Sequence, residues 1–335
     1  MEQDGQPRET VLQVNNLRTL FPVSRGIVGT LLARPRRYVH AVDGVSFSII
    51  RGEILGLVGE SGSGKTTTAL NALGLVEPTE GQILFNGQSV PALVHSRERL
   101  RLRRQAQIIF QDPYESLNPR QTVFATVAEP LEVHRLVKGR EDKIERVKAA
   151  LDAAGLKPPE IFLHRYPQEL SGGQRQRLVI AGALVLNPEL LVADEPVSML
   201  DVSIRAEILN LLRQLRDEHG ITILYITHDL ATAAYFTDRV AVMYLGRIVE
   251  IGPTKTVLSD PRHPYTQALL SVIPVPNPRR RRKRMILVGE TPNPIDLPSG
   301  CRFHPRCPVA SDQCSQTEPQ LQSVAADHQV ACLLV

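Results

Sequence analysis

One eight-residue segment, Gly59–Thr66, constrains the fold and the chemistry of this chain more than any other. It reads GESGSGKT and fits the pattern G-x-x-x-x-G-K-[ST]. The apolar run Ile54–Val58 before it predicts a buried strand, and Thr67–Leu73 after it predicts a helix. A phosphate-binding loop requires this order, because glycines let backbone N–H groups curl around phosphates and the helix N-terminus adds partial positive charge. The segment therefore predicts an α/β protein that binds a nucleotide.

The residue types within the loop suit a nucleotide bound together with Mg²⁺. Lys65 can reach the β- and γ-phosphates, and the hydroxyl of Thr66 can ligate the metal. The candidate cofactor-binding residues here are Gly59, Glu60, Ser61, Gly62, Ser63, Gly64, Lys65, Thr66 and Thr67. A chance glycine-rich turn is the alternative, and the flanking strand and helix argue against it.

The composition is that of an ordinary folded protein. The 335 residues suffice for one large or two ordinary domains, and 42% of them are hydrophobic, enough for a proper core. The formal net charge of +4 is too small to argue for a nucleic-acid partner. The longest apolar candidate, Leu178–Ala193, is broken by Asn187-Pro188-Glu189, and Met1–Gly5 has neither a basic start nor an apolar segment. We therefore expect no membrane span, no secretory signal and a soluble, cytosolic protein.

Strand and helix patterns alternate along most of the chain, which predicts a mostly parallel sheet. Strands are expected at residues 11–14, 45–49, 82–87, 108–110, 190–193 and 221–226, and helices at 141–154 and 203–219. The composition changes after residue 257, since the last 78 residues hold 11 of the 25 prolines and all four cysteines. We therefore predict a nucleotide-binding domain over residues 1–257 and a small loop-rich module over 258–335. The basic run Arg279–Arg284 is expected to be a solvated linker, with contact to anionic lipid as the alternative.

Two adjacent carboxylates follow the apolar strand Leu190–Ala193. Asp194 can hold Mg²⁺ directly or through water, and Glu195 can orient or deprotonate an attacking water. Adjacent carboxylates repel each other, so they are costly unless a cation or a catalytic role offsets the repulsion. An ordinary turn at a strand end is the alternative.

A second anion-binding surface is expected at a helix start that carries the residues Ser171, Gly172, Gly173 and Gln174. One nucleotide needs only one phosphate cradle, so a second one implies binding the γ-phosphate of ATP held by another subunit. A simple helix N-cap is the alternative. Two aromatic residues upstream of the loop, Phe21 and Tyr38, are candidates for stacking on an adenine ring, against the alternative of a core Phe and a surface Tyr.

Four cysteines, Cys301, Cys307, Cys314 and Cys332, are separated by five, six and seventeen residues. Four thiolates suit a tetrahedral Zn²⁺ or a 4Fe-4S cluster, although the spacing matches neither the common zinc pairs nor the bacterial ferredoxin run. A loop-rich module with little core often needs such a staple, and its role would be structural. Unliganded thiols are a third possibility, and His304 as a substitute ligand would favour zinc.

Taken together, these motifs resemble the ATP-binding-cassette (ABC) ATPases, and the resemblance covers nearly the whole chain. The motifs that carry it, in the order and spacing of that family, are Gly59–Thr66, Gln111, Leu170–Gln174, Leu190–Glu195, Ser198–Asp201 and His228. The resemblance is greatest to the ATPase subunits of dipeptide and oligopeptide importers, through the segments Phe110–Tyr114, Ser116–Pro119, Met243–Gly246, Pro261–Thr266 and the cysteine-bearing tail. The insertion between Phe21 and Ala41 resembles the second-ATPase type. The fold implied is a P-loop NTPase core with an antiparallel β subdomain, a helical signature subdomain and a small C-terminal module.

The resemblance also implies roles for single residues. Lys65 and the loop amides hold the phosphates, and Glu195 is the catalytic base. His228 contacts the γ-phosphate. Thr66, Gln111 and Asp194 bind Mg²⁺ and its waters. Ser171 and Gly173 clamp ATP across a dimer, and Asp201 couples the two ATP sites. Phe21 stacks on the adenine, with Tyr38 as the second candidate. The family usually has Arg at position 182 and Ala at position 199, where this chain has Gly182 and Met199, which could alter packing or coupling near the dimer interface.

The implied partners are a second, homologous ATPase that forms a heterodimer, two membrane permeases, and indirectly an extracytoplasmic solute-binding protein, with no nucleic acid. The expected place is the cytoplasmic face of the inner membrane, held there through the permeases. The segment Gln111–Leu117 forms the groove for a permease helix in that family, and ATPases with this tail resemble cluster binders, which favours 4Fe-4S. The alternatives are a soluble ABC ATPase acting on nucleic acid or the ribosome, and an importer of nickel or another small solute.

Overall fold

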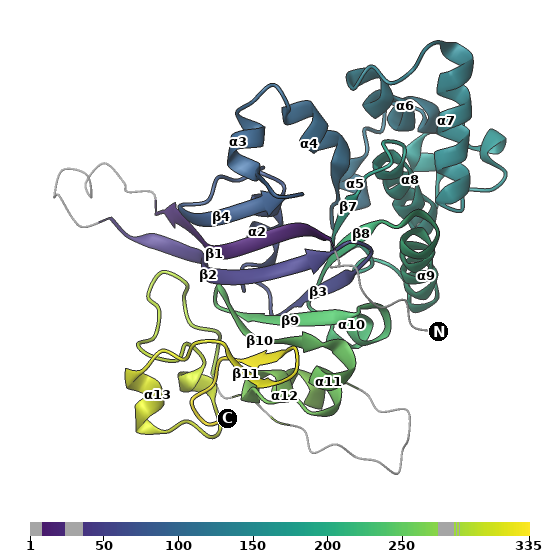
Figure 1. Ribbon diagram of the computed structural model, residues 1–335. Coiled ribbons are helices and arrows are strands. Elements are labelled where there is room, and N and C mark those ends of the chain that lie inside the picture. The colour runs from purple at the N-terminus through teal and green to yellow at the C-terminus, as the bar shows by residue number, and fades with distance from the viewer. Residues whose placement is uncertain (1–8, 24–35, 274–284, 286, 288) are drawn as a thin grey trace, which may run out of the picture. The chain divides into compact units, whose positions relative to one another are not determined.

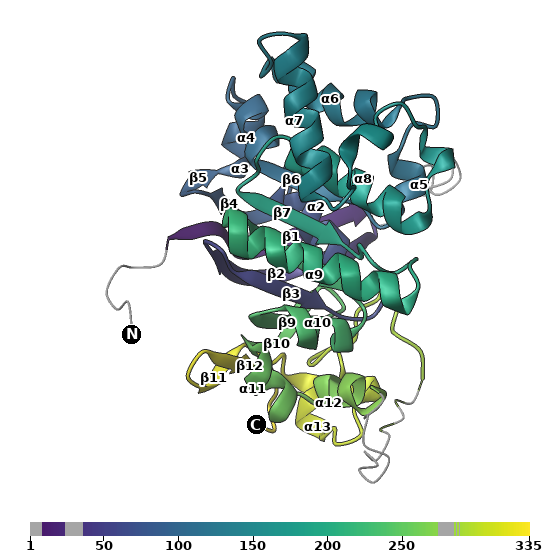
Figure 2. The same cartoon turned by 90° about the vertical axis from the view of Figure 1, so that its right-hand side faces the viewer.

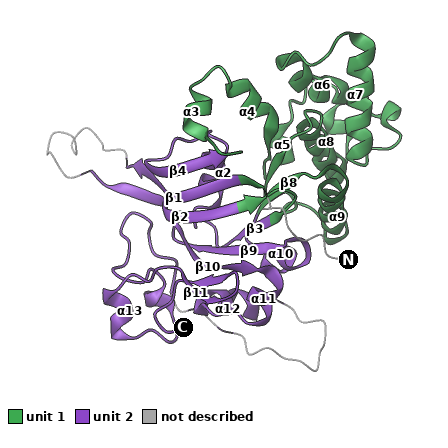
Figure 3. Ribbon diagram, viewed as in Figure 1, with its two compact units in different colours: residues 1–11, 49–54, 86–225 green, residues 12–48, 55–85, 226–335 purple. Residues whose placement is uncertain are grey.

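The computed structural model describes residues 9–23, 36–273, 285, 287 and 289–335. They form two compact units: residues 1–11, 49–54 and 86–225 make the first, and residues 12–48, 55–85 and 226–335 make the second (Figure 3). Three features of the sequence lie wholly or largely outside the described residues: the N-terminal segment Met1–Gly5, most of the insertion between Phe21 and Ala41, and the basic run Arg279–Arg284.

The second unit contains strands from two sheets. In one, β1 lies between β2 and β4, and β1 and β4 are antiparallel (Figure 1). The other has the order β11-β12-β10-β9-β3, with β3 and β9 parallel and the remaining neighbours antiparallel. The strands are β1 (Thr10–Pro22), β2 (Tyr38–Ile50), β3 (Ile54–Val58), β4 (Glu80–Phe85), β9 (Arg239–Tyr244), β10 (Arg247–Pro253), β11 (Gln322–Ala325) and β12 (His328–Val330). The helices are α2 (Lys65–Ala72), α10 (Leu230–Phe236), α11 (Thr254–Ser259), α12 (Pro264–Ser271), η3 (His304–Arg306) and α13 (Asp312–Gln316).

The first unit is mainly helical and carries the strands β6 and β7 and most of β8, in the order β8-β7-β6. Helices α6, α7 and α8 pack on one another (Figure 2). The strands are β5 (Gln88–Ser89), β6 (Ala106–Ile109), β7 (Leu190–Asp194) and β8 (Thr222–Thr227). The helices are α3 (Val90–Val94), α4 (Arg99–Gln105), α5 (Pro113–Ser116), α6 (Val123–Val133), α7 (Arg140–Ala153), η1 (Pro159–Ile161), η2 (Pro167–Glu169), α8 (Gly172–Leu184) and α9 (Val202–His219).

Local sequence signals account for most of these elements. All five residues of β3 are buried, as a continuous apolar run next to a parallel neighbour requires. The helix expected at 141–154 is α7, and the one expected at 203–219 is α9, which ends at Gly220 with a left-handed φ of 66°. The strands expected at 11–14 and 45–49 are correct in place but much too short. Both have 13 residues, because their alternation of buried and exposed side chains continues beyond the apolar positions that the sequence marks.

The strand expected at residues 108–110 ends earlier than the sequence predicts, and the tail beyond residue 257 joins a sheet. Phe110 was predicted to end a buried strand, but β6 stops at Ile109 and the Phe110 side chain is 44% exposed. The tail beyond residue 257 is loop-rich, yet its strand β12 pairs with β10, with Glu250 opposite Val330. The tail therefore continues a sheet of the second unit, and the domain boundary at residue 257 stays a prediction. In the part of the chain that the structure describes, no helix has both the length and the hydropathy that crossing a membrane requires.

Candidate functional site

The loop Gly59–Thr66 joins β3 to α2 in the second unit, as the sequence predicts. Glycine is required at two of its positions by close contacts. A Cβ on Gly59 would lie 2.1 Å from the carbonyl oxygen of Met243, and a Cβ on Gly64 would lie 2.1 Å from that of Ala41. Gly64 also has φ 102°, which disfavours a side chain. The first turn of α2 carries no acidic residue, so its N-terminus keeps the partial positive charge that favours an anion.

The ammonium group of Lys65 lies inside this loop and is held by loop atoms. Its Nζ donates to the carbonyl oxygens of Gly59 at 2.8 Å and Glu60 at 2.9 Å, with Ser63 Oγ at 3.4 Å. Lys65 is only 5% exposed, whereas the neighbouring Thr66 is exposed. The loop therefore combines one enclosed cation with an exposed threonine, a residue type whose hydroxyl can ligate Mg²⁺.

In the first unit, parallel pairing of β6 with β7 brings together the residues that follow the two strands. Ile109 lies opposite Ala193, so Gln111 and the Asp194–Glu195 pair follow at the same edge. The amide Nε2 of Gln111 donates to Glu195 Oε2 at 3.2 Å. Asp194 is 6% exposed at the end of β7. Carboxylate and amide oxygens of this kind are ligands that Mg²⁺ accepts.

The backbone of Glu195 is in an unusual conformation. Its φ is 47°, in the left-handed region that non-glycine residues rarely adopt. The carbonyl oxygen of Glu195 accepts hydrogen bonds from the Ser198 N–H at 3.2 Å and from Ser198 Oγ at 3.1 Å, which hold the turn. Strained backbone of this kind clusters at functional sites, where surrounding contacts must maintain it. Residue spacing carried no signal for this strain.

The segment Leu170–Gln174, which we call the signature segment, leads into helix α8 through a reciprocal capping box. Ser171 Oγ accepts from the Gln174 N–H at 3.3 Å, and the Ser171 N–H donates to Gln174 Oε1 at 3.0 Å. A Cβ on Gly173 would lie 2.8 Å from Ile204 Cγ2, so glycine allows the start of α8 to approach α9 closely. Both the cap and an exposed helix N-terminus are therefore present, and the two interpretations of the sequence are compatible.

The remaining predicted residues lie at turns and strand ends. Asp201 is the exposed N-cap of α9, and His228 is exposed in the turn between β8 and α10. Phe21 is 40% exposed near the end of β1, and Tyr38 begins the neighbouring β2, where Val23 N–H donates to Arg37 C=O at 3.0 Å. Phe21 and Tyr38 are thus at adjoining strand ends.

Gly182 and Met199, which depart from the family pattern, lie at positions with few packing constraints. A Cβ on Gly182 would meet no atom within 4 Å, and Met199 is 58% exposed. Neither residue disturbs the packing of the first unit.

The four cysteines lie in the second unit as free thiols, with Cys314 buried and the others half-buried. Burial, followed by the charge of neighbouring thiols, raises the pKa of Cys301, Cys307 and Cys332. Within the described ranges, however, no group of three or more His, Cys, Asp or Glu side chains is placed to hold a metal ion. His304 Nδ1 instead lies 2.9 Å from the carbonyl oxygen of Cys301. The structure therefore does not support the predicted cluster or its zinc alternative.

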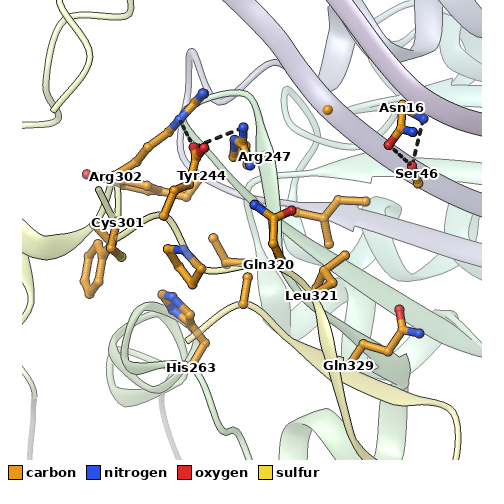
Figure 4. A pocket seen from close by; sticks show the side chains of 17 residues that line it. Asn16, Ser46, Tyr244, Arg247, His263, Cys301, Arg302, Gln320, Leu321 and Gln329 are labelled. Carbon is orange, nitrogen blue, oxygen red and sulfur yellow. Dashed lines mark hydrogen bonds and ion pairs between the residues drawn. The ribbon is translucent and has the colours of Figure 1, made fainter. Parts of the chain in front are cut away.

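A cavity of about 260 Å³ opens elsewhere in the second unit, between the tail and β10 (Figure 4). Arg247 and Arg302 lie on its wall, and ion pairs of 3.0 and 3.8 Å join them to Glu318. Of the candidate site residues only Cys301 lines it. This cavity is therefore not part of the phosphate-binding loop.

The sequence reasoning missed three tail residues that contact the loop. Tyr265, Thr291 and Arg306 all bond to Glu60, at 2.9, 2.6 and 2.9 Å. No local sequence pattern predicts their contacts with Glu60, because all three residues lie more than 200 positions away from it in the chain.

Comparison with known proteins agrees with this geometry. The family "ABC transporter" matches residues 42–198, and "Oligopeptide/dipeptide transporter, C-terminal region" matches residues 249–314. The chain is 47% identical over 329 residues to the oligopeptide transport ATP-binding protein AppF of Bacillus subtilis, covering 98% of each chain. It is 44% identical over 330 residues to OppF of Salmonella typhimurium, covering 98% of this chain and 97% of that protein.

Solved structures resemble the cassette part of the chain. A bacterial ABC transporter cassette solved as a dimer has a TM-score of 0.61 and 29% identity, and it covers 72% of this chain and 98% of that one. The protein cbiO1 of Clostridium perfringens, part of the ABC transporter complex cbiONQ, has a TM-score of 0.62 and 31% identity; the match covers 75% of this chain and 92% of that one.

Proposed function

This chain belongs to the ABC transporter family and is an ATPase that energises peptide import, and we propose how its residues divide that work. Its fold is the ABC cassette, with a P-loop NTPase core, an antiparallel sheet and a helical part. Membrane permeases and a partner ATPase are the partners of such a subunit. The alternatives of nucleic acid, the ribosome or nickel are not favoured, because the relatives are oligopeptide transport proteins.

The second unit supplies ATP binding. Lys65 and the loop amides hold the β- and γ-phosphates, and Phe21 stacks on the adenine with Tyr38 in reserve. The enclosed Lys65 ammonium and the exposed Phe21 ring support these roles. Thr66 offers an oxygen to Mg²⁺ together with Gln111 and Asp194, and the metal, when bound, offsets the charge of the phosphates.

The first unit supplies hydrolysis, and the contact between Gln111 and Glu195 is the observation that carries this proposal. Glu195 is the base that takes a proton from the attacking water, and Gln111 fixes the orientation of its carboxylate. The left-handed backbone at Glu195 is locally strained, and the hydrogen bonds from Ser198 to its carbonyl oxygen help to hold it. His228, which belongs to the second unit, contacts the γ-phosphate.

The variant Glu195→Gln tests this division, because the amide keeps the shape of the side chain and loses its basicity. In the transporter assembled with its permeases, ATP binding is retained while hydrolysis falls by about 100-fold or more. An ATP-bound dimer accumulates. The matched control is Glu145→Gln on the exposed face of α7, which leaves hydrolysis unchanged. Hydrolysis at the wild-type rate in Glu195→Gln refutes the assignment.

The signature segment of one subunit clamps ATP held by the other. Ser171 and Gly173 provide a hydroxyl and amides at the exposed start of α8, with Gly172 and Gln174 beside them, and Asp201 begins the next helix. We propose that the partner subunit is a second, homologous ATPase with a different sequence, so that the pair is a heterodimer. Mass measurement of the purified transporter distinguishes a heterodimer from two copies of this chain.

The segment Gln111–Leu117 forms the groove in which a short helix of a permease docks. Its helix α5 presents Tyr114, which is 58% exposed, and Phe110 just before it is also exposed. The guanidinium of Arg175 lies 4.3 Å from the centre of the Tyr114 ring and helps to fix it. Exposed aromatic side chains beside a site residue suit a surface that transmits hydrolysis to another protein. This docking places the subunit at the cytoplasmic face of the cell membrane, with the solute-binding protein as an indirect partner.

A structural 4Fe-4S cluster held by the four cysteines stays a prediction, with Zn²⁺ as its alternative. The sequence motivates it, since all four cysteines fall within the last 35 residues, although no group of described side chains is placed to hold a metal. Metal analysis of protein purified without oxygen tests it. Iron and sulfide with a broad absorption near 400 nm support the cluster, stoichiometric zinc supports the alternative, and neither metal rejects both.

A further inference from the structure

The phosphate-binding loop is held from outside by the tail, at a single loop residue. The carboxylate of Glu60 accepts hydrogen bonds from Arg306 Nη1 at 2.9 Å and Nη2 at 3.4 Å, and from Thr291 Oγ1 at 2.6 Å. The N–H of the same residue donates to Tyr265 Oη at 2.9 Å. Both the side chain and the backbone of Glu60 are therefore fixed by residues more than 200 positions later in the chain.

The groups that hold Glu60 are themselves rigidly placed. Tyr265 is fully buried, and its ring packs against Tyr244 at a centroid distance of 4.8 Å and against Phe303 at 5.4 Å. The Arg306 guanidinium lies 5.9 Å from the centre of the Tyr244 ring, and its side chain is only 10% exposed. Tyr244 ends β9, the parallel neighbour of the strand that enters the loop. The aromatic cluster thus connects the tail to the frame of the loop.

The same peptide group connects the tail to the loop lysine. Tyr265 holds the N–H of Glu60, while the carbonyl oxygen of Glu60 accepts from Lys65 Nζ at 2.9 Å. Any displacement of Glu60 therefore changes the position of a partner of the Lys65 ammonium. The Arg306 guanidinium also offsets the carboxylate charge of Glu60, which otherwise repels the phosphates of ATP. The effect is larger because the ion pair is partly enclosed and screening by solvent is weak there.

We propose that Arg306 is a positioning residue for the phosphate-binding loop and sets the affinity for ATP through its contact with Glu60. This inference rests on the proposed function, since it takes Gly59–Thr66 as the site of the phosphates. It goes further by making the cysteine-bearing tail a determinant of nucleotide binding. The hydrogen bonds of Arg306 are to Glu60, Thr291 and Tyr244, all in the second unit, so its removal changes ATP affinity more than turnover at saturation.

The test measures Mg-ATP binding by the full-length chain with a fluorescent ATP analogue, and hydrolysis in the assembled transporter. Arg306→Ala raises Kd and KM by about 10-fold, with kcat within about twofold of the wild type. Arg306→Lys keeps the positive charge but loses the two-nitrogen guanidinium contact with the Glu60 carboxylate, so its Kd lies between those of the wild type and Arg306→Ala. The control Arg262→Ala removes an exposed arginine whose side chain pairs with Asp260, and Kd is unchanged.

A double-mutant cycle separates positioning from a general loss of stability. In the background Glu60→Gln, Arg306→Ala has no further effect on Kd, because the partner that it holds has lost its charge. A wild-type Kd in Arg306→Ala, or an equal loss in both backgrounds, overturns the proposal. If Arg306→Ala does not fold, Arg306→Lys and Thr291→Ala decide the matter, since each weakens one bond to Glu60 and an unchanged Kd in both refutes it. ATP binding by Lys65→Ala is measured in the same experiment. If Lys65→Ala still binds ATP, the proposed nucleotide site itself is refuted. If Lys65→Ala loses ATP binding while the Arg306 variants keep the wild-type Kd, only the inference about Arg306 is refuted.

Discussion

Gln111 donates a hydrogen bond to Glu195 over 3.2 Å, although 84 positions separate the two residues in the chain. Parallel pairing of β6 with β7 produces this contact, because it aligns the ends of the two strands that precede them. The contact joins a residue assigned to Mg²⁺ with the residue assigned as the base.

Replacing Gln111 with Ala is expected to slow hydrolysis by about 10-fold without an equal loss of ATP affinity, since the Glu195 carboxylate loses the donor that orients it. Steady-state ATPase kinetics of the assembled transporter measure both quantities. Gln214→Ala is the matched control, because Gln214 makes a similar 3.0 Å bond to Glu218 on the exposed face of α9. Equal activity of the two variants contradicts the role of Gln111.

The exposed turn at α5 predicts a separation of hydrolysis from transport. Glu115→Lys combined with Tyr114→Ala reverses a charge and removes the exposed ring that we assign to the permease surface. Basal hydrolysis by the isolated subunit is expected to survive, while uptake by reconstituted vesicles falls to background. Cross-linking that places the permease on another face of the subunit argues against this assignment. Glu145→Gln, far along the sequence on α7, serves again as the control.

The close approach of α8 to α9 predicts that Gly173 tolerates no side chain. Gly173→Ala places a methyl group 2.8 Å from Ile204 Cγ2, so the Ile204 side chain or the first turn of α9 must shift, at a cost of about 1–3 kcal/mol. We expect a lower thermal midpoint and reduced hydrolysis in the assembled transporter. Gly182→Ala is the control, because a Cβ there meets no atom within 4 Å. Identical behaviour of both variants disproves the steric explanation.

Buried His263 predicts how stability depends on pH. Burial lowers the pKa of His263 from 6.5 to about 3, and its Nδ1 accepts from the Tyr265 N–H at 3.0 Å. Between pH 6.5 and pH 3 His263 is protonated in the unfolded chain but not in the folded chain, so the free energy of unfolding decreases as pH falls. The contribution of His263 to the free energy of unfolding is complete above about pH 6.5 and is lost toward pH 3, at about 1.4 kcal/mol per pH unit.

Denaturant unfolding of the full-length chain at pH 7, 6 and 5 measures this slope. In His263→Asn the slope is smaller, because Asn can still cap α12 but does not titrate. Glu250 and His328, which form a 2.8 Å contact near this ring, are present in both proteins and do not distinguish them. The exposed His164→Gln variant keeps the wild-type slope. A wild-type slope in His263→Asn contradicts the prediction.

Local chemistry in the sequence was enough to predict the loop, its strand and its helix. The GESGSGKT segment, the apolar run before it and the helical pattern after it are short-range signals, and β3 and α2 lie where they indicate. The segment Ser171–Gln174 was likewise predicted to begin a helix, and helix α8 begins there, with a capping box between Ser171 and Gln174. The phosphate loop by itself predicted nucleotide binding, and the ATPase function followed from the resemblance that the whole series of motifs carries.

Only the tertiary structure determined the contacts that join distant segments. The sequence marked Glu60 as one loop residue among nine, and nothing near it indicated Arg306, because that ion pair depends on how the tail packs on the Tyr244 cluster. It predicted Phe110 to be buried, but the strand ends one residue earlier, because pairing with β7 stops at Ile109. It also suggested a four-cysteine metal site from composition, whereas a metal needs its ligands at set distances, which spacing along a chain does not encode. Helix and strand propensities and short motifs depend on neighbouring residues and can be recognised in the sequence. The register of paired strands and the distances between distant side chains depend on how the whole chain packs.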